Sequence, residues 1–262
     1  MGQLVQPSIF ISHGTMYEAI KSNKLKSDFL KLRKKHLKNS PSAIVLFSGH
    51  WQTETISITT TENMIQMDEG FPPEFQTNYS TVGNPELAKR IIEMLTDNGI
   101  KAKAENNRGL DHGALIPLLL LFQNDKIPVL QISQQHKLDP QYHKKIAEIL
   151  NPLRTENILF IGSGGLVHNR NEIEKFGGHE IEPDNWGKEF DDFISTELAN
   201  KSDTNYADKI ISAYNHKQFF ISHPTSEHFL PLVFASAFGG QPTKIYEAFQ
   251  WKNLSMSAFK FD

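Results

Sequence analysis

The stretch AIVLFSGHW at residues 43–51 joins a long apolar run, which indicates the fold class, to a histidine that could bind a ligand. Residues 43–48, AIVLFS, form a continuous apolar run without alternation, which predicts a strand covered on both of its faces. Gly49 and His50 follow this run directly. In an open α/β sheet, ligands bind at the carboxyl ends of the strands, so the sequence places His50 where a binding group is expected.

Working outward from this strand, similar short runs alternate with helical patterns along the whole chain. The helix at 85–95 has Asn84 as its N-cap and Pro85 in its first turn. This alternation predicts an α/β fold with a central, mostly parallel or mixed sheet and helices on both faces. Because no linker stands out, we expect a single domain over residues 1–262. Further strands are predicted at 8–12, 127–132, 158–162, 219–222 and 254–261, and further helices at 140–150, 191–198 and after Pro231.

Composition narrows the classes of function. The 262 residues are 39% hydrophobic and 22% charged, which is ordinary for a globular protein. The absence of cysteine excludes disulfides, thiolate zinc sites and iron–sulfur clusters, so any metal must be held by His, Asp or Glu. The net charge of −3 gives no indication of nucleic-acid binding.

The sequence shows no recognisable targeting signal. No signal peptide is evident at residues 1–7, and the longest apolar run, 114–122, is too short to span a bilayer. We therefore expect a cytoplasmic protein without a nucleic-acid or membrane partner. The lysine-rich segment 21–38 is interpreted as a solvated helix with an apolar stripe, with a nucleic-acid or membrane surface as the alternative.

The histidines gather at equivalent places. Of 11, five fall at or just after the end of an apolar strand or at the mouth of a loop: His13, His50, His168, His223 and His228. A lone histidine of this kind is more often a core residue, but strands of one parallel sheet would deliver several imidazoles to one rim. Neutral imidazole is a preferred ligand of zinc and iron, so the pattern predicts a metal site at the C-terminal edge of the strands. Of the other six, we interpret five as solvated: His36, His136, His143, His179 and His216.

Other catalytic motifs are missing. There is no G-x-S-x-G nucleophile elbow and no H-E-x-x-H zinc-protease motif. The glycine-rich residues 162–165 are not followed by the lysine of a phosphate-binding loop.

At the level of motifs, the chain resembles the class III extradiol ring-cleavage dioxygenases and, within them, the DOPA-dioxygenase-type branch. The matching strings occur in family order and are specific only in combination. They are SHG at 12–14, SGHW at 48–51, GLDHG at 109–113, GLVHN at 165–169, HPTSEHFLPL at 223–232 and LSMS at 254–257.

This resemblance implies a single-domain enzyme with one divalent metal at the sheet edge. His13, His50 and His228 would ligate the metal, and His168 would be a further ligand or an acid/base. His112 would face the substrate and oxygen as a catalytic residue. The metal would be Fe(II) in the working enzyme or Zn(II) as found. The reaction would be cleavage of a small aromatic diol, a DOPA-like catechol, with O2 to a semialdehyde, by a monomer or small homo-oligomer.

The local sequence around these histidines suggests how they are held. His112 stands at the predicted start of a helix, where Asp111 would orient the imidazole or cap the helix. A strand running into the glycine turn at 162–165 would aim His168 back over the sheet edge. Glu227 and His228 are neighbours whose side chains point in different directions, so only His228 is expected to bind the metal.

The chain departs from the family pattern in places. Thr15-Met16 replaces the usual Ser-Pro, Gly49 replaces Ala, and Ser226 replaces Pro. The loop at 70–83 is shortened, with Phe75 near the usual Tyr, and we expect this loop to line the substrate pocket. Two alternatives are a redox-inert zinc hydrolase and a non-enzymatic binding protein on the same fold, although the latter would be expected to have lost some of the motif histidines.

Overall fold

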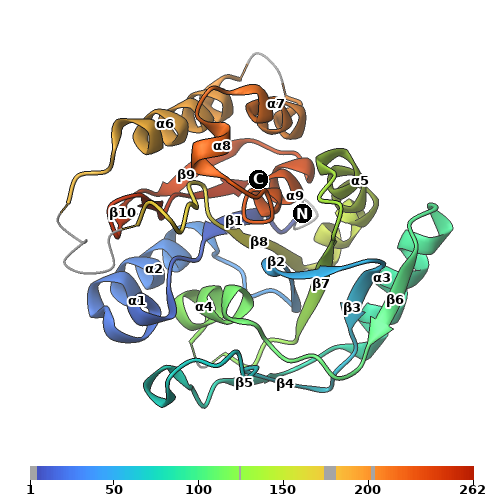
Figure 1. Cartoon of the computed structure of the whole chain (residues 1–262). Coiled ribbons are helices and arrows are strands. Elements are labelled where there is room, and N and C mark those ends of the chain that lie inside the picture. Colours follow the sequence, from blue (N-terminus) through green and yellow to red (C-terminus); the bar gives the residue numbers. More distant parts are fainter. Residues whose placement is uncertain (1–4, 124, 174–180, 202–203) are drawn as a thin grey trace.

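A mixed sheet forms the centre of the computed structural model, which describes residues 5–123, 125–173, 181–201 and 204–262. The strand order is β6-β3-β7-β2-β8-β1-β12-β9 (Figure 1). Its strands are β1 (Ser8–Ser12), β2 (Ala43–Thr53), β3 (Ile56–Thr59), β6 (Ala102–Glu105), β7 (Val129–Gln135), β8 (Ile158–Gly164), β9 (Pro242–Tyr246) and β12 (Ala258–Phe261). Two small ribbons pair β4 (Asn63–Ile65) with β5 (Ser80–Val82), and β10 (Phe249–Gln250) with β11 (Leu254–Ser255).

The middle of the sheet is parallel. Strands β7, β2, β8 and β1 run in one direction, with Ala43 opposite Ile158 and Ser8 opposite Phe160. The antiparallel neighbours are β12 beside β1, β9 beside β12, and β3 beside β7. The predicted α/β class with a mixed central sheet is therefore confirmed, and the parallel strands deliver their carboxyl ends to one edge.

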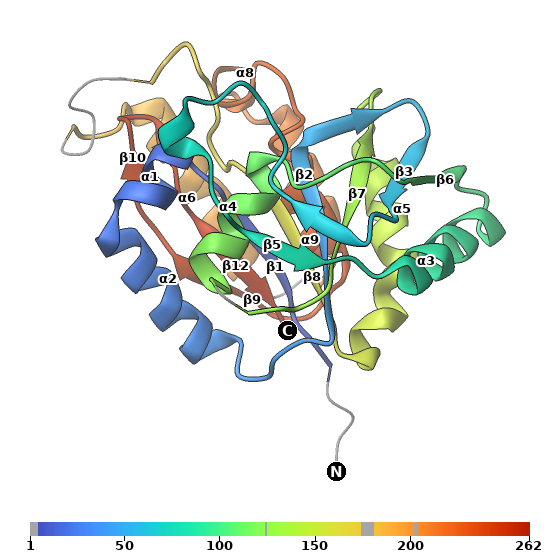
Figure 2. The ribbon, with the colours of Figure 1, turned by 90° about the horizontal axis from the view of Figure 1, so that it is seen from below.

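Helices cover both faces, as the unbroken apolar strands predict. Val45 and Phe47 of β2 enter one buried cluster, and the alternate residues Ile44 and Leu46 enter the other. The first cluster contains residues of α3 (Pro85–Asp97), α5 (Pro140–Leu150), α6 (Asn185–Ala199), α7 (Tyr206–Ser212) and α9 (Leu230–Ala237). The second contains residues of α1 (Met16–Lys21), α2 (Asn23–His36) and α4 (His112–Leu121). Figure 2 shows α2 and α4 on the near side of the sheet.

Most predicted elements are present with small differences at their ends. Helix α3 begins as expected, with the Asn84 side chain accepting a hydrogen bond from the Leu87 amide. The lysine-rich segment forms α2, whose buried stripe is Leu25, Phe29 and Leu32. The tail is not one strand but two, β11 and β12. Short 3₁₀ helices also occur at η1 (Pro73–Phe75), η2 (Asn151–Glu156) and η3 (Ala213–Asn215).

One predicted strand is wrong. Residues 219–222, FFIS, form the short helix α8 (Phe219–Ser222). The two buried positions, Phe219 and Ser222, are three residues apart, which is helical spacing, and Phe220 between them is 74% exposed. A four-residue apolar run carries too few repeats to separate helix from strand by periodicity.

Among the helices that the structure describes, none is long and apolar enough to cross a membrane.

Candidate metal centre

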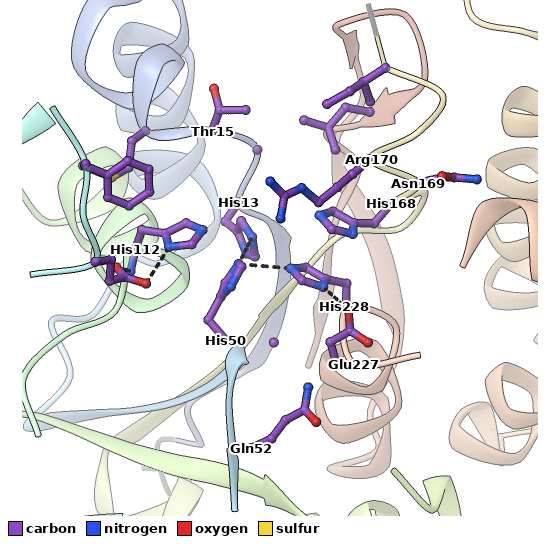
Figure 3. Close-up of a pocket in the computed structure, with 17 residues that line it drawn as sticks. His13, Thr15, His50, Gln52, His112, His168, Asn169, Arg170, Glu227 and His228 are labelled. Atoms are coloured by element: carbon purple, nitrogen blue, oxygen red, sulfur yellow. Dashed lines mark hydrogen bonds and ion pairs between the residues drawn. The ribbon is translucent and has the colours of Figure 1, made fainter. Parts of the chain in front are cut away.

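Three imidazoles meet at the carboxyl edge of the sheet. His13 directly follows β1, His50 lies in the last part of β2, and His228 lies just before α9. The Nε2 atom of His50 is 3.2 Å from Nε2 of His13 and 3.0 Å from Nε2 of His228 (Figure 3). The structure thus brings together the three histidines that were predicted as metal ligands.

Hydrogen bonds to Nδ1 determine the tautomers of His13 and His228. The Ser163 hydroxyl donates to the carbonyl oxygen of Gly113 at 2.5 Å, so it can only accept from Nδ1 of His13 at 3.1 Å. The carboxylate of Glu227 likewise accepts from Nδ1 of His228 at 3.1 Å. Both rings therefore present the lone pair of Nε2 to His50.

This donor set fits a divalent metal. Nitrogen lone pairs that face one another repel unless a cation lies between them. An ion about 2.0–2.2 Å from each imidazole nitrogen would hold these nitrogens about 3.0–3.5 Å apart. The observed separations of 3.0 and 3.2 Å agree with such an ion. All-imidazole coordination suits zinc and iron.

Burial keeps the three imidazoles neutral, as metal ligands must be. Desolvation, followed by the neighbouring histidines, holds the pKa of His13 and of His228 well below the ordinary value. Desolvation, with a further contribution from His112, lowers the pKa of His50 to about 3. At neutral pH all three lone pairs are available without the release of a proton.

His168 lies against the same group. It follows β8 through Gly164 and Gly165, and its amide donates to the carbonyl oxygen of Ser222 at 3.0 Å. Its ring stacks on that of His228, with centroids 3.6 Å apart and an interplanar angle of 6°. Burial is the main reason that the pKa of His168 falls to about 4, so this ring is neutral as well.

His112 is the first residue of α4 and faces the cavity from the other side (Figure 3). Its ring centroid is 3.7 Å from that of His50. Nδ1 of His112 lies 2.9 Å from one carboxylate oxygen of Glu69, and the His112 amide donates to the other at 2.6 Å. Glu69, rather than Asp111, therefore orients the imidazole.

Asp111 performs only the second of its two predicted roles. It caps α4 by accepting from the amide of Ala114 at 3.0 Å. The buried carboxylate also accepts from the Ser48 hydroxyl at 2.7 Å and from Arg108 at 2.9 Å. These contacts tie the start of α4 to β2, the strand that carries His50.

Two other histidines differ from their predicted settings. His223 follows the helix α8 instead of a strand, and its buried Nε2 donates to the carbonyl oxygen of Leu166 at 2.9 Å. His143 was interpreted as solvated, but it is fully buried: Nε2 accepts from the Gln135 amide at 2.9 Å and Nδ1 donates to the Asp139 carbonyl oxygen at 2.6 Å. The charged neighbours of His143 in sequence conceal that it lies on the inner face of α5.

Three further histidines that the structure describes, His36, His136 and His216, lie outside the centre. His136 is exposed, as expected, whereas His36 and His216 are half-buried. His179 lies outside the described residues.

A cavity of about 680 Å³ opens above the histidines, within the usual range for small-molecule sites. Glu69 and Phe71 contribute to its lining, so the segment around the shortened loop does reach the pocket. Phe75 is not part of the lining and instead contacts Phe71 and Tyr17 edge-on. Arg170, two positions after the motif histidine His168, also lines the cavity. Glu69 could not be recognised from the sequence, because it lies 43 positions from the histidine that it contacts.

The comparisons with known proteins cover nearly the whole chain. The family described as the catalytic LigB subunit of aromatic ring-opening dioxygenase matches residues 6–260. The 4,5-DOPA dioxygenase extradiol of Beta vulgaris is 35% identical, over 98% of this chain and 97% of its own length. Proteins of the same name from Portulaca grandiflora and Escherichia coli K12 are 34% and 28% identical, over 97% and 98% of this chain and 95% and 94% of their own lengths. A crystal structure of an uncharacterized Escherichia coli K12 protein shares the fold, with a TM-score of 0.80 and 24% identity, over 98% of this chain and 100% of that one.

Proposed function

The chain belongs to the family of the catalytic LigB subunit of aromatic ring-opening dioxygenases and is an extradiol ring-opening enzyme, and from that premise we propose its substrate and its working residues. The substrate is a DOPA-like catechol, which O2 converts to a semialdehyde. The names of the relatives support this substrate class. The observation that carries the proposal is that the Nε2 atoms of His13 and His228 lie 3.2 and 3.0 Å from Nε2 of His50, with the cavity above them. Residues 1–262 would act as one catalytic domain.

His13, His50 and His228 would hold one divalent metal, Fe(II) in the working enzyme, with Zn(II) as an alternative occupant. When bound, the ion lowers the pKa of substrate hydroxyl groups, and as Fe(II) it provides a redox-active centre for the reaction with dioxygen. Ser163 and Glu227 fix the ring orientations of His13 and His228 from behind.

His168 would remove a proton from a substrate hydroxyl. The nitrogen lone pair with which His228 would hold an ion lies in the plane of the His228 ring. A ring stacked parallel on His228 has its own lone pairs in a different plane, so the observed stacking favours an acid/base role over ligation of the same ion. With its pKa near 4, His168 is unprotonated at neutral pH and can accept a proton.

His112 would act from the opposite side of the cavity. Because the Glu69 carboxylate can only accept, Nδ1 of His112 carries the hydrogen and Nε2 carries the lone pair. The Glu69 carboxylate holds the ring in this orientation and tautomer. His112 can therefore hold or transfer a proton close to the substrate without binding the metal.

The test is a panel of catechols supplied to anaerobically prepared protein loaded with Fe(II). A yellow semialdehyde product and uptake of one O2 per catechol support the proposal. Protein that hydrolyses esters or amides with Zn(II), and consumes no O2 with any catechol when loaded with Fe(II), would instead be a hydrolase. Bound metal with neither activity would indicate a binding protein.

A further inference from the structure

Arg170 lines the cavity but has no role in the metal binding and proton transfer proposed above. Among the described residues that line the cavity, it is the only lysine or arginine. Figure 3 shows its guanidinium directed into the cavity, near His168 and above the histidine group. Its position places a permanent positive charge beside the space that a substrate would fill.

No carboxylate of the described residues forms an ion pair with Arg170. The two glutamates that line the cavity each contact a histidine, Glu69 with His112 and Glu227 with His228. Within the described ranges, Arg170 has neither an ion pair nor a side-chain hydrogen bond. Each of the other four arginines has such a partner: Arg33 has Asp125, Arg90 has Glu156, Arg108 has Asp111, and Arg154 has three carbonyl oxygens.

The backbone beneath Arg170 is nonetheless firmly held. Asn169 donates from its side chain to the Ile221 carbonyl oxygen at 2.7 Å and accepts from the Asn171 amide at 3.0 Å. The Asn169 carbonyl oxygen accepts from the Glu172 amide at 3.1 Å. With the His168 amide bound to Ser222, these contacts close a turn that presents Arg170 at a set position on the rim. The guanidinium at the end of this exposed side chain has no partner among the described residues, and it is suited to bind an anionic part of a ligand.

We propose that Arg170 forms an anion subsite that binds a carboxylate on the side chain of the catechol, while the diol of the ring lies over the histidines. A guanidinium pairs with a carboxylate through two parallel hydrogen bonds, which provides both affinity and orientation. The subsite selects catechols with an acidic side chain over neutral catechols of the same size. This inference rests on the proposed function, because it assumes a catechol in the cavity.

A matched ligand pair isolates the charge: dihydrocaffeate carries a carboxylate, and its methyl ester has nearly the same shape without the charge. Calorimetry on the anaerobic Fe(II) protein gives the ratio of the two affinities without turnover. Oxygen uptake in air gives the corresponding ratio of kcat/KM. The variants are Arg170→Gln and Arg170→Lys, with Arg90→Gln as a control that removes an exposed arginine from α3, outside the cavity.

We expect the wild type to favour the acid by about tenfold, the size of one charge-assisted contact. Arg170→Gln brings the ratio close to one, Arg170→Lys keeps part of it, and Arg90→Gln keeps all of it. An unchanged ratio in Arg170→Gln, with an unaltered melting temperature, overturns the subsite. If the ratio responds to Arg170→Gln but neither compound is oxidised, the subsite stands and the dioxygenase proposal fails. If both compounds are oxidised but Arg170→Gln leaves the ratio of their affinities unchanged, the dioxygenase proposal stands and the subsite fails.

Discussion

The Nε2 atoms of His50 and His228 lie 3.0 Å apart, although 178 positions separate the two residues in the chain. His50 belongs to the central strand β2. His228 lies in the segment before α9, and this helix packs against β8, β1 and β2. The site therefore depends on the packing of the sheet and not on any local motif.

Replacement of His50 tests the metal site most directly. We expect His50→Ala to lose nearly all bound metal, because the two remaining nitrogens cannot complete the coordination of the ion. Metal content measured by mass spectrometry after dialysis is the readout. The exposed His136→Ala is the matched control and should keep one metal per chain. Full metal content in His50→Ala would place the ion elsewhere.

Ser163 should strengthen the affinity of the site for the metal without binding the metal itself. Its hydroxyl accepts from Nδ1 of His13 and so keeps the lone pair of Nε2 directed at the site. We expect Ser163→Ala to weaken metal affinity by about 10- to 100-fold, as for other groups that orient metal ligands. Competition with a chelator measures this change. Ser236→Ala, which removes another buried hydroxyl from α9, should leave the affinity unchanged.

Substitution of His112 should separate catalysis from metal binding. His112→Ala is expected to keep its metal and to lower kcat by about 10²- to 10⁴-fold, the range for a lost acid/base group. Glu69→Gln should show a smaller loss, since the imidazole would remain but would lose the carboxylate that orients it. Steady-state kinetics together with metal analysis provide the test. A metal-free His112→Ala would identify His112 as a ligand.

His168→Gln decides between the two roles of that residue. As an acid/base, it should keep the metal, still bind catechol, and lose most of kcat at neutral pH, with partial recovery at higher pH where the phenol ionises unaided. In the wild type the pKa of His168 is lowered to about 4, so the base stays unprotonated above that value and the rate should fall only as the pH approaches it. If His168→Gln comes without metal, the residue is a ligand.

Buried neutral histidines should make the metal-free protein sensitive to acid. Burial lowers the pKa of His143 to about 4, while in the unfolded chain it is about 6.5. Above pH 6.5 neither state binds the proton; as the pH falls below about 6.5 the unfolded state binds it first, so stability is lost with falling pH.

The contribution of His143 is measurable by substitution. Between pH 7 and pH 5 we expect protonation of His143 in the unfolded chain to lower the free energy of unfolding by about 2 kcal/mol. This figure follows from the difference between the pKa values of His143 in the folded and unfolded states. Denaturant unfolding of metal-free wild type and His143→Gln across this range gives the difference. Equal losses in the two proteins would show that His143 does not contribute to acid sensitivity.

Much of the fold could be predicted from the sequence, because the central strands are buried on both faces and so consist of unbroken apolar runs. Histidines placed just after such runs pointed to the sheet edge, and the structure gathers His13, His50 and His228 there. Residues 219–222 show the limit of this reasoning, since a short apolar segment packs equally well as a turn of helix.

The contacts behind the site were beyond sequence reasoning for a physical reason. Glu69 reaches His112 across 43 positions and Ser163 reaches His13 across 150, and no periodicity links residues so far apart. His143 was misassigned because its burial depends on which face of α5 meets the sheet. Arg170 stood beside a motif residue, but only the geometry reveals that it lines the cavity.

The position of β1 has a consequence for biosynthesis. The first strand of the sheet to be translated lies between β8 and β12, and Ser8 pairs with both Phe160 and Phe261. One edge of β1 must therefore stay unpaired until the last strand has left the ribosome, and pairing between such distant segments is slow. His13 directly follows β1, so the place of this residue in the site becomes fixed only when both edges of β1 are paired.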